Sequence, residues 1–130
     1  MAEKLILVID DSKVSLMRTN RELENAGYAV ITENNAYSVF ESAIDNHPKL
    51  IICDYTMPGM NADRIIRKLK TDAATAGIPI IVYSSQSDQP LVENVIELGA
   101  SALVEKSGDY TLLLEKIKEL LGENDFMVEF

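Results

Sequence analysis

Short apolar runs alternate with longer stretches of helical periodicity along this 130-residue chain. The runs have the length of buried strands, whereas the stretches between them repeat their apolar residues at spacings of three and four. This alternation is typical of βαβ units built around a parallel sheet. We therefore expect an α/β fold whose five strands cover residues 4–9, 29–32, 50–53, 78–83 and 102–105.

The composition of the strands indicates their places in the sheet. Apart from Lys4 at the start of the first, strands 4–9, 50–53 and 78–83 are apolar, as expected for central strands that are covered on both faces. Strand 29–32 is shorter and more mixed, which suits an edge. Helices should cover both faces, and the periodic stretches place them near residues 12–25, 36–46, 62–69, 89–98 and 110–121.

Composition and charge limit the class of protein. Hydrophobic residues make up 47% of the chain and charged residues 25%, which is typical of one folded soluble domain. No apolar run approaches the roughly 20 residues of a membrane span, and the single cysteine makes the cytoplasm the default location. A net charge of -9 argues against direct binding to nucleic acid or anionic membranes. We expect a domain over residues 1–122 and a short tail over 123–130.

Polar residues stand where the predicted strands end. Asp10 and Asp11 follow the first strand, Asp54 the third, Ser84 the fourth and Lys106 the fifth. Right-handed crossovers place the carboxyl ends of all parallel strands at one edge of the sheet. Ligands of open α/β sheets bind at that edge, where the strand order reverses. These five side chains therefore define a candidate site.

The residue types at this edge favour phosphoryl chemistry. Carboxylates within about 5 Å of one another repel by roughly 3 kcal/mol per pair at an effective dielectric of 20, so the cluster needs a counter-ion. Oxygen ligands favour Mg²⁺ or Mn²⁺. Asp54 could then attack phosphorus as a nucleophile, while Lys106 and Ser84 pair with phosphoryl oxygens.

Each of these residues also has an ordinary structural explanation. Asp10 and Asp11 before Ser12 could form only a turn and a helix cap. Asp54 could simply end a strand, and Lys106 could be an exposed lysine. Only the joint placement of such residues at the ends of four strands favours the functional interpretation.

The chain resembles the CheY-like receiver domain of bacterial response regulators over about residues 4–121. The resemblance depends on four motifs in the family's order and spacing: Leu7-Val8-Ile9-Asp10-Asp11-Ser12, Asp54-Tyr55-Thr56-Met57-Pro58-Gly59-Met60, Pro79-Ile80-Ile81-Val82-Tyr83-Ser84-Ser85, and Gly99-Ala100-Ser101-Ala102 leading to Lys106. It implies a doubly wound (βα)5 fold of flavodoxin-like type, with strand order 2-1-3-4-5.

The resemblance also implies roles for the site residues. Asp54 would accept a phosphoryl group from a histidine kinase or a histidine phosphotransfer protein. Asp11, Asp54 and the backbone carbonyl of Thr56 would bind Mg²⁺, with Asp10 helping through water. Ser84 would be the switch hydroxyl and Lys106 the invariant lysine. The residues that would tune the phosphoryl group's lifetime or accessibility are Thr56, Ser85 and Gln86.

Such a domain is a signalling switch and not an enzyme in the usual sense. Its downstream protein target would bind the face formed by the helix that begins near Asp88, the strand 102–105 and the helix 110–121. A homodimer formed through the same face is an alternative, which the apolar residues of the 123–130 tail could assist or block.

Two residues depart from the family pattern. Leu103 stands where the family has a switch aromatic, so it has no ring to move into a gap left by Ser84. Ser107 replaces a proline whose peptide bond is typically cis. Because a cis bond before a residue other than proline costs about 3–4 kcal/mol, we predict a trans Lys106–Ser107 bond. The loop to Asp109 should then be rearranged or more mobile.

Three alternatives to a phosphorylated switch remain. A pseudo-receiver would keep the fold as a binding module, although such domains usually lose an acidic residue or the lysine. Phosphatases of the haloacid-dehalogenase type need an Asp-x-Asp motif, whereas Asp10 and Asp11 are adjacent. A flavodoxin needs a loop after the first strand that holds the FMN phosphate, which Asp10 and Asp11 would repel.

Overall fold

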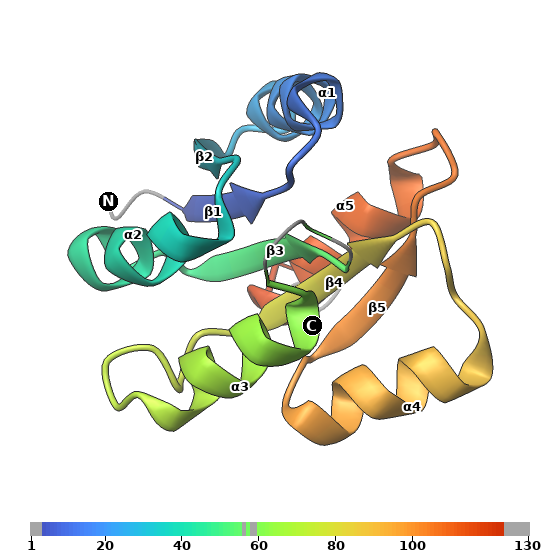
Figure 1. Ribbon diagram of the computed structural model, residues 1–130. Coiled ribbons are helices and arrows are strands. Elements are labelled where there is room, and N and C mark those ends of the chain that lie inside the picture. The colour runs from blue at the N-terminus through green and yellow to red at the C-terminus, as the bar shows by residue number, and fades with distance from the viewer. Residues whose placement is uncertain (1–3, 56, 58–59, 124–130) are drawn as a thin grey trace, which may run out of the picture.

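The computed structural model describes residues 4–55, 57 and 60–123 of the chain. Five parallel strands form one sheet in the order β2-β1-β3-β4-β5. This arrangement confirms the predicted doubly wound fold, with β2 and β5 at the two edges (Figure 1). The strands are β1 (Leu5–Ile9), β2 (Ala29–Glu33), β3 (Leu50–Asp54), β4 (Ile80–Ser84) and β5 (Ala102–Glu105).

Helices cover both faces of the sheet. Side chains of α1 and α5 pack with one face, and those of α2, α3 and α4 pack with the other. The helices are α1 (Lys13–Asn25), α2 (Val39–Asn46), α3 (Ala62–Thr71), α4 (Gln89–Leu98) and α5 (Thr111–Leu120), and a 3-10 turn, η1 (Ala36–Ser38), precedes α2.

The two-residue period of the central strands builds two separate cores. Leu7 of β1 and Ile51 of β3 face the α2–α4 layer, whereas their neighbours Ile6 and Ile52 face the α1–α5 layer. All four side chains are at most 1% exposed. A strand buried on both faces must be apolar at every position, which explains why these runs show no alternation in the sequence.

The boundary of β4 differs from the prediction for a local reason. The expected strand began at Ile78, but the Ile78 amide donates to the Thr75 carbonyl and closes a turn. Pro79 has no amide to donate, although its carbonyl accepts from Ile51. The strand therefore starts at Ile80 and continues through Ser84, one residue farther than expected.

Local residues fix the start of α1 and the end of α4. The Ser12 hydroxyl accepts a hydrogen bond from the Ser15 amide at 3.2 Å and caps α1. Gly99 follows α4 with a φ of 118°, a left-handed conformation that other residues rarely adopt. The Lys106–Ser107 bond is trans, as predicted. The altered shape or mobility of the loop that follows it stays a prediction.

The last described residue, Glu123, contacts Lys4 near the N-terminus and Tyr28 just before β2. The Tyr28 hydroxyl donates to Glu123 Oε1 at 2.7 Å, and Lys4 forms an ion pair with the same carboxylate. The remainder of the predicted tail, residues 124–130, lies outside the described residues. Within the ranges that the structure describes, no helix has the length and apolar character needed to cross a membrane.

Candidate functional site

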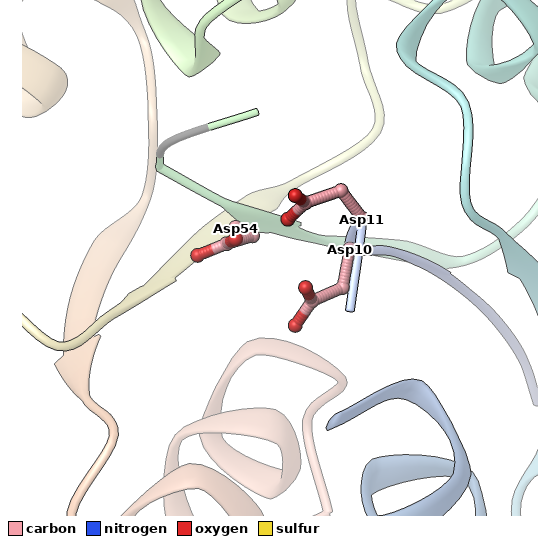
Figure 2. A group of neighbouring side chains, drawn as sticks. All are labelled: Asp10, Asp11 and Asp54. Atoms are coloured by element: carbon pink, nitrogen blue, oxygen red, sulfur yellow. The ribbon is translucent and has the colours of Figure 1, made fainter. Parts of the chain in front are cut away.

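The carboxyl ends of the strands bring the predicted acidic residues together. Asp10 and Asp11 follow β1 directly, and Asp54 is the last residue of the neighbouring strand β3. One carboxylate oxygen from each of the three lies within 4.8 Å of the others. Figure 2 shows the three side chains close together where the strands end. The arrangement that the sequence predicted for these three residues is therefore present.

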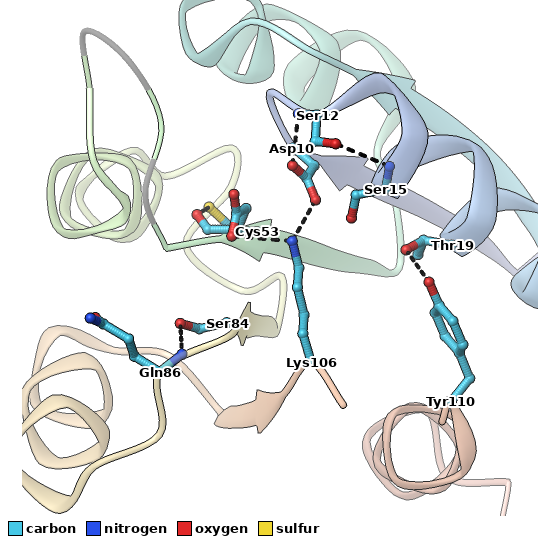
Figure 3. A network of polar contacts seen from close by, with 10 residues as sticks. Asp10, Ser12, Ser15, Thr19, Cys53, Ser84, Gln86, Lys106 and Tyr110 are labelled. Carbon is cyan, nitrogen blue, oxygen red and sulfur yellow. Dashed lines mark hydrogen bonds and ion pairs between the residues drawn. The ribbon is translucent and has the colours of Figure 1, made fainter. Parts of the chain in front are cut away.

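Lys106 reaches this cluster from the end of β5. Its Nζ atom lies 2.7 Å from Asp10 Oδ2 and 3.4 Å from Asp54 Oδ1 (Figure 3). Asp10 is 3% exposed, and its other oxygen accepts a hydrogen bond from the Ser12 amide at 2.9 Å. The buried carboxylate of Asp10 is thus both ion-paired and hydrogen-bonded, as a charge removed from water requires.

One lysine does not neutralise three carboxylates. Burial, together with the charge of Asp10, raises the pKa of Asp54 to about 6, although Lys106 pulls that pKa downward. Burial lowers the pKa of Lys106, but the hydrogen bond and charge of Asp10 outweigh it, so the pKa of the lysine is raised. Lys106 therefore stays cationic while the cluster as a whole keeps an excess of negative charge.

This donor set fits a hard divalent cation. It offers carboxylate oxygens, and neither histidine nor cysteine is among the residues that could hold a metal in the described part of the chain. Asp11 is exposed, which leaves an open side for water or a phosphoryl oxygen. The fourth predicted ligand, the carbonyl of Thr56, lies outside the described residues.

Ser84 ends β4 at the same edge of the sheet. Its side chain is 3% exposed, and its hydroxyl accepts a hydrogen bond from the Gln86 amide at 3.0 Å (Figure 3). Its backbone carbonyl accepts from the Lys106 amide, which joins the ends of β4 and β5. Ser85 and Gln86 are exposed on the loop that follows. These predicted tuning residues therefore adjoin the edge that carries the carboxylates.

Leu103 lies opposite Val82 in the register of β4 and β5. It is partly buried and packs against the core that α2, α3 and α4 cover. Its side chain is therefore directed toward the face of the sheet that contains α4. The position predicted for a switch residue is occupied here by an ordinary aliphatic contact.

The sequence did not predict an aromatic pair that lies next to Lys106. The Tyr83 ring lies 5.6 Å from Lys106 Nζ and 5.9 Å from the ring of Tyr110. The Tyr110 hydroxyl is 3.1 Å from the hydroxyl of Thr19, which is 1% exposed (Figure 3). A chain of contacts thus connects α1 and α5 to the acidic cluster. The only signal in the sequence was an aromatic residue beside a predicted site residue.

Cys53 precedes Asp54 but takes no part in the cluster. It is fully buried, and its thiol donates to the backbone carbonyl of Asp54 at 3.2 Å. Burial and the charges of Asp54 and Asp10 raise the pKa of the thiol. Cys53 is therefore a core residue, and its protonated thiol is a poor nucleophile.

Comparison of the sequence with known proteins shows which family the chain belongs to. The family model described as "Response regulator receiver domain" matches residues 6–118. The phosphate regulon transcriptional regulatory protein PhoB of Pseudomonas aeruginosa is 29% identical over 121 residues, which cover 93% of this chain and 53% of PhoB. Protein PilH of the same organism is 28% identical over 117 residues, 90% of this chain and 97% of PilH. The chain therefore spans about half of PhoB but nearly all of PilH.

The same fold occurs in solved structures. Chemotaxis protein CheY4 of Vibrio cholerae superposes with a TM-score of 0.86 at 21% identity, over 92% of this chain and 99% of that one. At this identity the likeness establishes the fold alone. The family match over residues 6–118 goes further: this chain belongs to the response regulator receiver domain family of two-component signalling.

Proposed function

We propose that this receiver domain is a phosphorylation-dependent switch. Asp54 would accept a phosphoryl group from the phosphohistidine of a histidine kinase or a histidine phosphotransfer protein. The observation that supports this proposal best is the cluster of Asp10, Asp11 and Asp54, two of whose members contact Lys106. An uncompensated cluster of this kind is unfavourable by itself and suits a site that binds a cation and an anion in turn.

The chemical step is a transfer between two nucleophiles. An Asp54 carboxylate oxygen attacks the donor's phosphorus, the phosphorus–nitrogen bond breaks, and the imidazole leaves with its electron pair. The product is an aspartyl phosphate and a histidine freed of its phosphoryl group. Mg²⁺ or Mn²⁺ held by Asp10, Asp11 and Asp54, with the Thr56 carbonyl, would supply the positive charge that lets two anionic groups meet.

Lys106 and Ser84 would stabilise the product. The lysine Nζ, 3.4 Å from Asp54 Oδ1, is close enough to pair with an oxygen of a phosphoryl group on that residue. The Ser84 hydroxyl accepts from the Gln86 amide and still has its own proton to donate. These changes of partner at the ends of β4 and β5 would constitute the switch.

The residues around the acceptor would set how long the phosphoryl group survives. Ser85 and Gln86 are exposed beside Ser84, where they could admit or exclude an attacking water. We assign them, together with Thr56, a tuning role. Leu103 has no ring to reorient, so the signal would pass through the backbone that connects Ser84 and Lys106.

The output of such a switch is binding and not catalysis of an external reaction. We propose that a downstream protein binds the face formed by α4, β5 and α5, in the cytoplasm, and that residues 1–122 form the functional unit. A homodimer through the same face is the other arrangement that this face could support.

Beryllofluoride, a phosphoryl mimic, tests the pocket without a kinase. Calorimetric titration in the presence of Mg²⁺ should show one binding site on the wild type and none on Asp54→Asn. Lys106→Met should bind at least about tenfold more weakly because a direct charge-assisted contact is lost. The matched control is Lys116→Met, which removes a partly buried lysine of α5 that pairs with Glu119 away from the acidic cluster, and this variant should bind the mimic normally. A wild type that does not bind the mimic would contradict the proposal and favour the pseudo-receiver.

A further inference from the structure

A groove with an apolar lining runs along the edge of the sheet between α4 and α5. Its volume is about 460 Å³, with Leu103 and Val104 of β5 between Val92 of α4 and Leu112 of α5. Leu112 is 64% exposed, which is unusual for a large apolar side chain. Ile96, one helical turn after Val92, is 44% exposed on α4. The groove therefore presents apolar surface that nothing in the described part of the chain covers.

The rim of this groove is acidic. Glu115 and Glu119 line it from α5, and Glu105 lines it from the end of β5. The groove's one lysine, Lys116, has its Nζ 2.9 Å from Glu119 Oε2 and is already paired. Three carboxylates against one ammonium leave a net charge of -2 around the lining.

The α5 residues of the groove form one continuous stripe. Leu112, Glu115, Lys116 and Glu119 follow i, i+3, i+4, i+7 spacing and so lie on one face of the helix. This face is mostly charged, unlike the face of α5 that carries the buried Leu113 and Ile117. An apolar centre with a charged border is the usual form of a groove that accepts an amphipathic helix.

We propose that the occupant of this groove is a basic amphipathic segment of a partner protein. Its apolar residues would cover Leu103 and Leu112, and its lysines or arginines would meet Glu105, Glu115 and Glu119. The inference rests on the proposed function, in which this face carries the output, and adds the chemical class of the partner.

Charge disfavours a second copy as the occupant. A two-fold pairing would place the same groove opposite itself, bringing six carboxylates together with only two lysines. Each copy also has a net charge of -9. Like charges facing each other across an interface cost several kcal/mol, whereas a basic segment would gain from the same carboxylates.

The groove is connected to the acidic cluster through its rim. Glu105 directly precedes Lys106 and lies opposite Ser84 in the register of β4 and β5. Its carboxylate accepts a hydrogen bond from the Ser87 hydroxyl at 3.0 Å, three residues beyond Ser84. Changes of partner at Ser84 and Lys106 would therefore shift the two groups that form this end of the rim. The affinity for the segment should respond to the phosphoryl mimic.

Fluorescence anisotropy with two designed peptides tests the proposal. Both have roughly 18 residues, about five helical turns, with leucine at i, i+3, i+4, i+7 positions. One has lysine at the remaining positions and the other has glutamate. The titrations use the wild type, Glu115→Gln/Glu119→Gln, and the control Glu41→Gln/Asp45→Asn. The control removes two exposed carboxylates of α2 beside another apolar groove.

The lysine peptide should bind the wild type, and the glutamate peptide should not. Neutralising Glu115 and Glu119 should weaken binding by about 3- to 10-fold, and the control should bind within about twofold of the wild type. Equal losses in both double variants would overturn the proposal, since binding would then follow net charge alone. Failure of the lysine peptide to bind, or a wild-type dimer in sedimentation that Leu112→Glu dissociates, would also overturn it.

Parallel titrations with Mg²⁺ and beryllofluoride separate this proposal from the proposed function. Peptide binding that the mimic strengthens about fivefold or more would support both. Peptide binding by a protein that does not bind the mimic would support the groove's specificity and contradict the switch. Binding of the mimic without binding of either peptide would leave the switch intact and overturn the basic partner.

Discussion

Replacing Asp54 by asparagine should stabilise the metal-free protein, although it removes the proposed phosphoryl acceptor. The Asp54 side chain is 15% exposed and shares its surroundings with Asp10 and Asp11. Burial and the charge of Asp10 raise its pKa from the usual 3.8 to about 6. An acid whose pKa is raised by folding is less stable as a carboxylate in the folded state than in the unfolded state.

The size of the effect follows from these two values. Each tenfold change in an acid's dissociation constant corresponds to about 1.4 kcal/mol, so ionised Asp54 lowers the free energy of unfolding by about 3 kcal/mol near pH 7.5. Asparagine keeps the shape without the charge and should recover a large part of this, roughly 1–3 kcal/mol.

The pH dependence gives the prediction a second test. As the pH falls through about 6, Asp54 of the folded wild type takes up a proton before Asp54 of the unfolded chain does. The loss in free energy of unfolding that ionised Asp54 causes therefore decreases. The stability difference between variant and wild type should therefore fall to about half its value near pH 5 and stay constant above about pH 7. Added Mg²⁺ should also narrow the difference, because it would stabilise the wild type more than the variant.

Urea unfolding followed by circular dichroism measures these differences. The matched control is Asp45→Asn, which neutralises an exposed carboxylate of α2 and should change stability by less than about 0.5 kcal/mol. If Asp54→Asn were no more stable than the wild type at pH 7.5, repulsion and burial would not destabilise the ionised Asp54. A difference independent of pH would refute the assignment to the titration of Asp54.

Three further predictions concern the surroundings of the cluster. Lys106→Met should destabilise the metal-free protein by roughly 3 kcal/mol in urea unfolding, because buried Asp10 loses its ion pair; a loss as small as that of Lys116→Met would contradict this. Tyr110→Phe should lower the free energy of unfolding by about 1–2 kcal/mol, because the buried Thr19 hydroxyl loses its hydrogen bond. Adding Thr19→Val to this variant should recover part of the loss, whereas an additive loss would be inconsistent with the pairing of the two hydroxyls. Cys53 should react with a thiol reagent only upon unfolding, since it is buried and its pKa is raised by burial; rapid modification of the native protein would disprove this.

Most of the fold could be predicted from the sequence because its elements have strong local signals. The apolar runs of β1, β3 and β4 are buried on both faces, and the Ser12 and Gly99 signals act where the pattern places them. The start of β4 could not be predicted in this way. It depends on a hydrogen bond from Ile78 to Thr75, a turn contact that apolar periodicity does not reveal.

The acidic cluster was predictable because topology alone brings strand ends to one edge. The parallel sheet alone predicts that these side chains lie together, without any knowledge of side-chain packing: Asp10, Asp11, Asp54 and Lys106. The contacts between Tyr83, Tyr110 and Thr19 were not predictable, because they join three elements far apart in the chain. The acidic rim on α5 is visible in the sequence as a helical stripe, but its apposition to Leu103 and Val92 required the structure.

Intact mass spectrometry shows whether Asp54 accepts a phosphoryl group in a cation-dependent reaction. The wild type and Asp54→Asn would be incubated with acetyl phosphate, a small phosphoryl donor, with Mg²⁺ and with a chelator in its place. We predict a gain of one phosphoryl group by the wild type, only with Mg²⁺, and none by the variant. An equal gain by Asp54→Asn, or a gain independent of the metal, would contradict the assignment of Asp54 as the acceptor in a cation-dependent pocket.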